Sequence, residues 1–300
     1  MGIVVRPATP ADLERLIAEL DRQFVFGKGR RISLAQRFPA VYCSQNASNL
    51  FLLEEQGNIL ACLACKRFEF LCRGDAWRGA MIGAVYTHPR RRGEGLASRL
   101  LREAEGALRA RDVAYSVLWT EQPAFYARIG WVRADHGLLG QFESHSHPGK
   151  PSRDVARRPA QSADFEHIER LRRRWCDCLM PRRSEDYRQL PPPATAVDLL
   201  TWGEGTDHAA YALVGNDGAM SILYEMIGDP AGFAALWPEA CRGYRRTLIN
   251  DVSGSASHSW LTANSDLVWH AKPLAMWLPL SARTDLTHVA RWHIPYFDRI

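Results

Sequence analysis

The stretch Val85-Tyr-Thr-His-Pro-Arg-Arg-Arg-Gly-Glu-Gly-Leu-Ala-Ser98 decides how this sequence folds. The apolar run 80–85 leads into it and predicts a strand. Beyond it, apolar residues recur every fourth position, which predicts a helix. These residues are Leu96, Leu100, Ala104 and Leu108. A strand, a tight turn and a helix N-terminus together favour an anion, because free N–H groups point outward and the helix dipole adds about half a positive charge there.

The turn itself carries two glycines and three consecutive arginines. Gly93 and Gly95 tolerate positive φ and let the main chain approach a phosphate closely. Arg90, Arg91 and Arg92 add full positive charge. The expected ligand therefore carries a pyrophosphate. The alternative is a basic turn that only caps the following helix.

Three motifs resemble the GNAT acetyltransferases, in the order that this family shows them. Arg92-Gly-Glu-Gly-Leu-Ala97 follows the pattern Arg-x-x-Gly-x-Ala and resembles the family's acyl-CoA pyrophosphate loop. Arg6-Pro-Ala-x-x-x-Asp12 precedes it, and Phe125-Tyr-x-Arg-x-Gly-Trp131 follows it. The resemblance covers residues 3 to about 145. Mostly antiparallel strands with one strand–helix–strand crossover at the glycine loop predict an α+β fold.

The second half of the chain repeats the first. Arg158-Pro-Ala-x-x-Ala-Asp164 matches Arg6-Pro-Ala-x-x-Ala-Asp12 at an offset of 152 positions. A repeat of this kind indicates that the unit is a whole domain. We expect two tandem GNAT-like domains, 1–147 and 153–300, each with a mixed, mostly antiparallel sheet flanked by helices. The Pro- and Gly-containing stretch 147–152 reads as the linker between them.

The second domain is expected to be a degenerate copy. Its counterpart of the glycine loop is Ile227-Gly-Asp-Pro-Ala-Gly-Phe-Ala234, which has no arginine, and Asp229 would repel a phosphate. The pattern further predicts helices over 165–178 and 231–248, a hairpin around 215–218, and strands over 220–226 and 259–261. An active first and degenerate second domain resemble the "enhanced intracellular survival" acetyltransferases, whose third, sterol-carrier-like domain is absent from this sequence.

The resemblance implies a site for acetyl-CoA. The main chain of Val85, Tyr86 and Thr87 would pair with the pantetheine arm, and Glu121 and Gln122 would line that arm. The pyrophosphate would be bound by seven consecutive residues of the loop, namely Arg92, Gly93, Glu94, Gly95, Leu96, Ala97 and Ser98. Tyr126 would donate a proton to the departing thiolate. The alternative for Tyr126 is a core tyrosine that packs beside Phe125.

The implied function is an acetyl-CoA-dependent N-acetyltransferase. An amine of a small molecule or a protein would attack the thioester directly, and the acceptor cannot be identified from the residues. The alternative is a non-catalytic acyl-CoA-binding regulatory module. His88 and Glu121 are near enough in sequence to act as the base, but neither is required. The survival family uses its C-terminal carboxylate, a role that we do not extend to Ile300 because the third domain is missing.

Composition argues against several other classes. The formal charge is +5, and no basic block is interleaved with aromatic residues, so nucleic-acid binding is not expected. The N-terminus does not read as a signal peptide, and no apolar run reaches about 18 residues, so we expect a cytoplasmic protein without a membrane partner. Seven cysteines, an odd number, suit a reducing compartment, and no paired Cys/His set predicts a metal. The second domain is expected to wall the acceptor site or to form a homo-oligomer contact.

Overall fold

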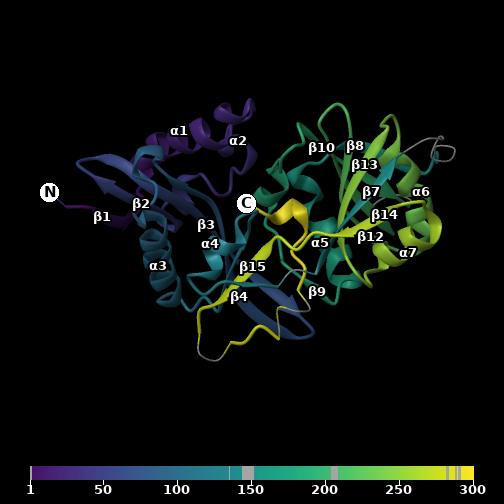
Figure 1. Ribbon diagram of the computed structural model, residues 1–300. Helices are drawn as coiled ribbons and strands as arrows, with labels where there is room; N and C mark the ends of the chain where they lie inside the picture. The colour runs from purple at the N-terminus through teal and green to yellow at the C-terminus, as the bar shows by residue number, and fades with distance from the viewer. Residues whose placement is uncertain are drawn as a thin grey trace. The chain divides into compact units, whose positions relative to one another are not determined.

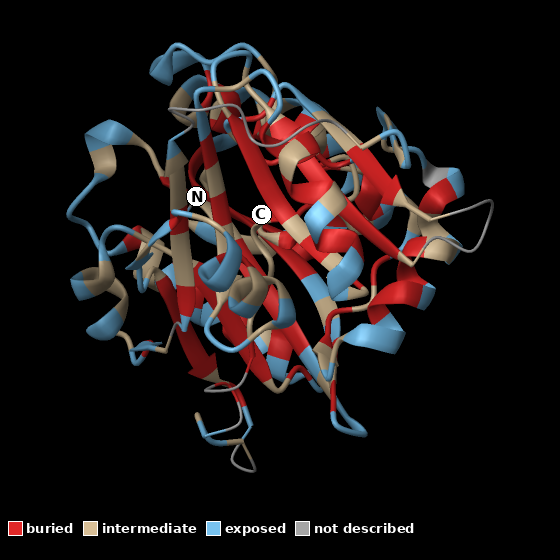
Figure 2. Ribbon diagram, turned by 90° about the vertical axis from the view of Figure 1, so that its right-hand side faces the viewer, coloured by how far each residue is buried: buried red, intermediate tan, exposed pale blue. Residues whose placement is uncertain are grey.

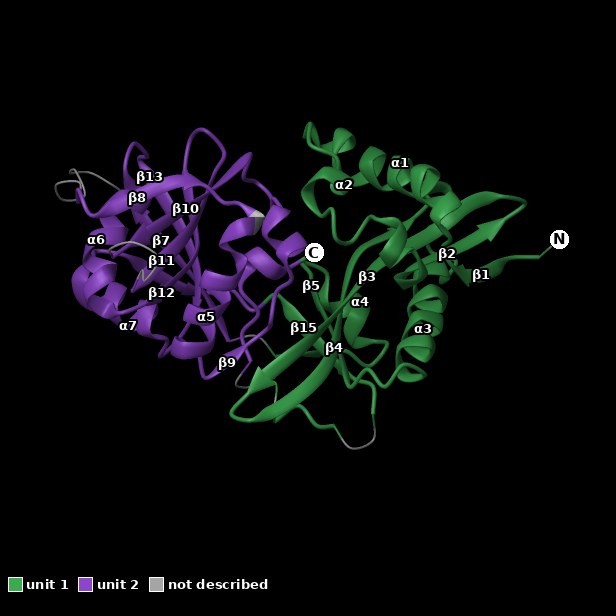
Figure 3. Cartoon of the chain, turned by 180° about the vertical axis from the view of Figure 1, so that it is seen from behind, with its two compact units in different colours: residues 1–134, 274–290, 300 green, residues 135–273, 291–299 purple. Residues whose placement is uncertain are grey.

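The chain divides into two compact units in the computed structural model. The structure describes residues 2–134, 136–143, 152–203, 209–281, 284–287, 289 and 292–300. Unit 1 comprises residues 1–134, 274–290 and 300, and unit 2 comprises residues 135–273 and 291–299 (Figure 3). Each unit combines one mixed sheet with flanking helices, so the predicted α+β class with two mixed sheets is confirmed.

Unit 1 is built on one mixed sheet in which β4 and β5 pair in parallel. Its strands are β1 (Val4–Pro7), β2 (Leu50–Glu55), β3 (Asn58–Cys72), β4 (Asp75–Thr87), β5 (Tyr115–Trp119), β6 (Val132–Arg133) and β15 (Ala275–Pro279). They lie in the order β1-β2-β3-β4-β5-β15-β6. Its α-helices are α1 (Leu13–Phe24), α2 (Leu34–Arg37), α3 (Leu96–Arg109) and α4 (Pro123–Ala127).

Two separate apolar clusters cover the two faces of the unit 1 sheet. On one face, α1 buries Leu16 and Leu20 completely, and the side chain of Tyr86 packs into the same cluster. On the other face, α3 buries Leu100 and Leu108, the spacing that its sequence predicts, and α4 adds its aromatic residues. Helices α1 and α3 accordingly lie on opposite sides of the strands (Figure 1). The sheet therefore has an α1 face and an α3/α4 face.

Unit 2 has the same kind of sheet, parallel only between β12 and β13. The strands of this sheet are β7 (Gly137–Glu143), β8 (Val155–Pro159), β10 (Ala196–Trp202), β11 (Ala210–Asn216), β12 (Ser221–Gly228), β13 (Arg246–Val252) and β14 (Val268–Ala271), and the two-residue strand β9 (Cys178–Leu179) is not part of it. The sheet order is β14-β7-β13-β12-β11-β10-β8. Its α-helices are α5 (Phe165–Trp175), α6 (Pro230–Cys241) and α7 (Ala256–Asn264). Buried residues concentrate along the strands (Figure 2).

Strands β7 and β15 each belong to the sheet that is built mainly from the other half of the sequence. β7 follows β6 along the chain, yet it pairs antiparallel with β13 and β14 in unit 2. β15 follows β14 along the chain, yet it pairs antiparallel with β5 and β6 in unit 1. The units are therefore discontinuous, unlike the continuous domains 1–147 and 153–300 expected from the sequence. Most of the predicted linker 147–152 lies outside the described residues.

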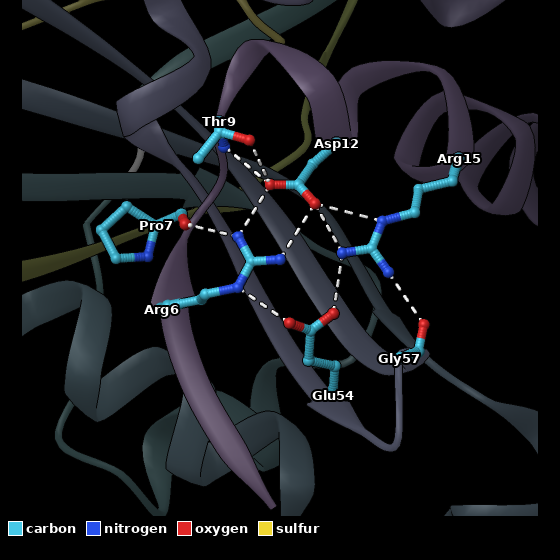
Figure 4. Close-up of polar contacts among 7 residues, drawn as sticks. All are labelled: Arg6, Pro7, Thr9, Asp12, Arg15, Glu54 and Gly57. Atoms are coloured by element: carbon cyan, nitrogen blue, oxygen red, sulfur yellow. Dashed lines mark hydrogen bonds and ion pairs between the residues drawn. The ribbon is translucent and has the colours of Figure 1, made fainter.

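The repeated Arg-Pro-Ala motif forms the same local structure in both units. Arg6 binds the Asp12 carboxylate through both terminal nitrogens, at 2.7 and 2.9 Å (Figure 4). Arg158 binds Asp164 in the same bidentate way. Each aspartate also accepts a hydrogen bond from the main-chain N–H three residues earlier, at 2.8 and 2.9 Å. The motif thus fixes the turn between the first strand and the first helix of each unit.

Unit 1 extends this ion pair into a four-residue cluster. Glu54 of β2 accepts hydrogen bonds from Arg6 and Arg15, each at 2.8 Å (Figure 4). Arg15 also binds Asp12 at 2.5 Å and so closes a ring of two cations and two anions. The cluster ties β1, β2 and α1 together. Its residues satisfy one another, so we assign it a structural role.

Three helix and strand boundaries differ from the sequence-based expectation. The helix predicted over 165–178 ends with α5 at Trp175. The helix predicted over 231–248 ends at Cys241, where Gly243 adopts φ +83°, and the chain continues as β13. The strand predicted over 259–261 lies inside α7. Pairing of β13 with β12 and β7 outweighs the local helical pattern.

Across the residues that the structure describes, no helix combines the length and the apolar character needed to cross a bilayer.

Candidate functional site

Strands β4 and β5 of unit 1 are paired over a short length only. Their register runs from Gly79 opposite Tyr115 to Met81 opposite Val117. Beyond this point β4 has a bulge, where Ala84 adopts φ +48° and the pairing with β3 shifts register. Bulges bend a strand and redirect its edge. Within the described residues, β4 beyond Met81 therefore offers main-chain groups on its β5 side that no strand pairs.

The glycine loop follows this open edge and leads into α3. Gly95 is the N-cap of α3 with φ +75°, and Gly93 has φ +86°. A Cβ at either glycine would meet nothing within 4 Å, so the space in front of the loop is open. In the described part of the chain, no acceptor is recorded for the N–H groups of Leu96, Ala97 and Ser98. The loop has the donors and the space that an anion requires.

The three arginines of the loop have different surroundings. Arg91 is paired with Glu94 at 2.7 Å and with Glu55 at 3.1 Å, and this arginine holds the pKa of Glu94 below its usual range. Among the residues that the structure describes, Arg92 reaches neutral acceptors only, the Thr87 carbonyl at 3.4 Å and Gln23 at 3.5 Å. The charge of Arg92 therefore remains available to an anion, whereas residue 94 offers only its N–H group.

Tyr126 lies on the same face of the sheet as the open strand edge. Its ring and Val85 of β4 both pack against the α3/α4 cluster. The ring makes edge-to-face contacts with Phe125 and Trp131, with centroids 4.8 and 6.1 Å apart. Burial raises the pKa of Tyr126 to about 12. Its hydroxyl has no recorded hydrogen-bond partner among the described residues, so the proton can be given to a ligand.

The other predicted residues take different positions. Glu121 and Gln122 are exposed between β5 and α4. The Tyr86 side chain points to the α1 face, where its hydroxyl donates to Glu19 at 3.2 Å, so only its main chain borders the open edge. The His88 Nδ1 atom accepts a hydrogen bond from the N–H of Arg90 at 3.3 Å. This bond occupies one of the two ring nitrogens, which weakens the case for His88 as a base.

The fold brings two further residues to this region, Glu19, which sequence reasoning missed, and Ile300, which it named but set aside as a base. Glu19 of α1 contacts Tyr86, as described above. Ile300 belongs to unit 1 and packs against the apolar cluster of the α1 face, which also contains Tyr86. The amphipathic pattern of α1 predicts which of its apolar residues are buried. It does not predict which of its polar residues contacts β4. The family resemblance raised the C-terminal carboxylate as a base, and the fold places Ile300 beside Gly83 of β4.

The described residues of unit 2 form no corresponding cradle. Only Asp229 separates β12 from α6, whereas residues 88–95 separate β4 from α3. The Asp229 carboxylate caps α6 by accepting a hydrogen bond from the N–H of Ala231 at 2.8 Å. A Cβ at Gly228 would lie 2.4 Å from the Cα of Ala210, and one at Gly232 would lie 2.6 Å from its Cβ. The strand–helix junction is therefore closed, and its helix end already carries a carboxylate.

Residues 4–134 match the family described as "Acetyltransferase (GNAT) domain". The whole chain resembles a GCN5-related N-acetyltransferase from Anabaena variabilis (TM-score 0.72, 13% identity, 93% of this chain and 73% of that chain). It also resembles a probable N-acyltransferase from Enterococcus faecalis (0.71, 14%, 93% and 73%) and Eis1 from Mycobacterium abscessus (0.63, 10%, 92% and 74%). No curated protein matches the sequence. The fold is that of a tandem GNAT protein.

Proposed function

We propose that this chain, whose residues 4–134 match a GNAT acetyltransferase domain, transfers an acetyl group from acetyl-CoA to a primary amine. The observation that carries the proposal is one arrangement on the α3/α4 face of unit 1. This face combines three features, namely an unpaired strand edge, an open glycine loop at a helix N-terminus and an unpaired tyrosine hydroxyl.

These groups match the parts of coenzyme A. The β4 main chain at Val85, Tyr86 and Thr87 offers hydrogen bonds to the amides of the pantetheine arm, as an added strand would. The loop N–H groups from Gly93 to Ser98, together with Arg92, favour the pyrophosphate. Glu121 and Gln122 flank the arm at the end of β5. Because a Cβ at Gly93 or Gly95 meets no protein atom, the cradle has room for the phosphates.

Acetyl-CoA supplies an acetyl group activated as a thioester. A main-chain N–H at the open β4 edge can polarise the carbonyl as negative charge develops on its oxygen. The amine nitrogen forms a bond to the carbonyl carbon, and the carbon–sulfur bond breaks. The amine releases one proton to solvent. The Tyr126 hydroxyl, still protonated at pH 7 because its pKa is about 12, gives its proton to the thiolate and regains a proton from solvent.

The test uses the full chain, acetyl-CoA and a panel of primary amines. Thiol release above the rate without acceptor, together with acetylated product by mass spectrometry, would support the proposal. Isothermal calorimetry should give one CoA per chain, because the junction between β12 and α6 in the second unit is closed. Tight CoA binding without turnover of any amine would instead identify an acyl-CoA-binding regulatory module.

A further inference from the structure

A pocket of about 260 Å³ lies on the α1 face of unit 1. It is lined by Glu19, Arg22, Gln23, Tyr86, His88, Pro89 and Arg90. Tyr86 is two residues beyond the bulge at Ala84, which corresponds to roughly 7 Å along a strand. The pocket thus opens beside the proposed thioester position, on the face opposite Tyr126. Its position suits the second substrate of the proposed transfer.

Glu19 is the acidic group of this pocket. Its side chain is 22% exposed, and its two oxygens accept hydrogen bonds from Arg22 at 2.9 Å and from the Tyr86 hydroxyl at 3.2 Å. A carboxylate has about four acceptor sites, so Glu19 retains capacity for another donor. An ammonium or amine group entering the pocket would find its acceptor here.

The remaining polar groups of the pocket are mostly donors. In the described part of the structure, the Arg90 guanidinium has no recorded ion pair or hydrogen bond. Because the Nδ1 atom of His88 accepts from the N–H of Arg90, the neutral ring carries its proton on Nε2, which is then a donor. With Glu19 at −1 and Arg22 and Arg90 at +1 each, the lining has a formal charge of +1. This charge disfavours polycations.

We infer that the acceptor is an amine that also carries a carboxylate, as an amino acid does. Glu19 binds the amine, and Arg90, assisted by the His88 Nε2–H, binds the carboxylate. The inference rests on the proposed function, because it names the substrate class for that same reaction. It assigns Arg90 to the acceptor rather than to the cofactor phosphates.

The test compares leucine, leucinamide and 1,5-diaminopentane as acceptors. Leucinamide keeps the amine and the side chain of leucine but lacks its negative charge. We expect kcat/KM for leucine to exceed that for the other two amines by about 10-fold or more, the effect of losing one charge-assisted hydrogen bond. Leucinamide or diaminopentane acting as well as leucine would overturn the inference and leave the acetyltransferase proposal intact.

Three variants test which residues bind the amine and the carboxylate of the acceptor. Arg90→Gln should lower kcat/KM for leucine about 10-fold and leave leucinamide within about 2-fold. Glu19→Gln should lower both, since both carry the amine. Arg67→Gln removes an exposed positive charge on β3 outside the pocket lining and should change neither. If Arg90→Gln weakens CoA binding instead, Arg90 serves the cofactor and the inference is wrong.

A binding measurement separates this inference from the proposed function. Leucine is titrated calorimetrically into the chain saturated with CoA, in the wild type and in Arg90→Gln. Leucine binding that is lost in the variant would support the pocket even if no amine is acetylated. Absence of leucine binding together with absence of leucine turnover would overturn the inference.

Discussion

Gly83 of β4 and Ile300 meet so closely that a Cβ at position 83 would lie 2.8 Å from the Ile300 main-chain oxygen. The same Cβ would lie 3.1 Å from the Ile300 Cγ1 atom. The contact falls two residues past Met81, where the β4–β5 pairing ends. Glycine at position 83 is thus what allows the segment at Ile300 to reach the candidate site.

Gly83→Ala should therefore destabilise the chain, because the nearest atom is main chain and cannot rotate away. We expect a loss of about 1–3 kcal/mol in the free energy of unfolding, measured by urea denaturation. Gly106→Ala is the matched control. Position 106 is exposed inside α3 with nothing within 4 Å, so alanine should stabilise by up to about 1 kcal/mol. Equal stability of the two variants would show that the Gly83–Ile300 contact does not restrict the side chain at position 83.

Tyr126→Phe should impair the chemical step without affecting binding. The variant keeps the ring contacts with Phe125 and Trp131 and loses only the hydroxyl that we propose as proton donor. We expect kcat to fall roughly 100-fold, the usual scale of general acid catalysis. The Kd for CoA should stay within about 2-fold, since a hydroxyl that bonds only the thiolate adds little to binding. A fully active variant would exclude Tyr126 from the mechanism.

The pH profile offers an independent check on Tyr126. Its pKa, raised by burial to about 12, keeps the hydroxyl protonated well beyond the pH at which an ordinary tyrosine, with a pKa of about 10, ionises. Loss of this proton should therefore not reduce kcat between about pH 8 and 10.5. Steady-state rates across that range measure it. A fall in kcat centred near pH 10 that disappears in Tyr126→Phe would contradict the claim that burial raises the pKa of Tyr126.

Gly95→Asp should weaken CoA binding. Aspartate at φ +75° is strained, and its charge would face the pyrophosphate across the open cradle. We expect the Kd for CoA to rise by about 10-fold or more, a penalty of about 1.4 kcal/mol. Gly218→Asp in unit 2 is the control, since Gly218 also has positive φ (+91°) and open surroundings but lies in a hairpin far along the chain. Equal affinities of the two variants for CoA would argue against the glycine loop as the pyrophosphate site.

Asp12→Asn should destabilise unit 1 in a pH-dependent manner. The hydrogen bond from Arg6 holds the pKa of Asp12 well below its usual range. A carboxylate of this kind stabilises the fold above its unfolded pKa of about 3.9, and the contribution shrinks as pH falls below that value.

We therefore expect a cost of about 1–3 kcal/mol at pH 7, which narrows between about pH 4 and 2. Urea unfolding at several pH values measures this difference. Asp266→Asn, at an exposed position without a recorded partner among the described residues, should show no such trend. A pH-independent cost for Asp12→Asn would show that packing rather than charge is responsible.

The sequence predicted the local features of the first unit well. Glycine spacing and helical periodicity identified the loop and α3, because both depend on residues close together in the chain. The repeated Arg–Asp pair predicted the second unit for the same reason. These patterns could not show that β15 inserts between β5 and β6, since strand partners are selected in three dimensions.

The candidate site was harder to predict on the α1 face. Glu19 looks like any polar residue on an amphipathic helix, and its relation to Tyr86 depends on how α1 crosses the sheet. In the second half, the β-strand β13 was mistaken for part of a helix because its pairing with β12 and β7 is not local. Contacts between distant segments account for both errors.

The reciprocal placement of β7 and β15 constrains synthesis as well as structure. A ribosome makes all of residues 1–134 long before β15, so the first sheet stays open between β5 and β6 until position 279 has emerged. Strand β7 likewise has no partner strand until β13 and β14 have been synthesised. Neither sheet can therefore be completed by its own half of the chain. If the two halves were made as separate proteins, each should have an incomplete sheet with an exposed edge.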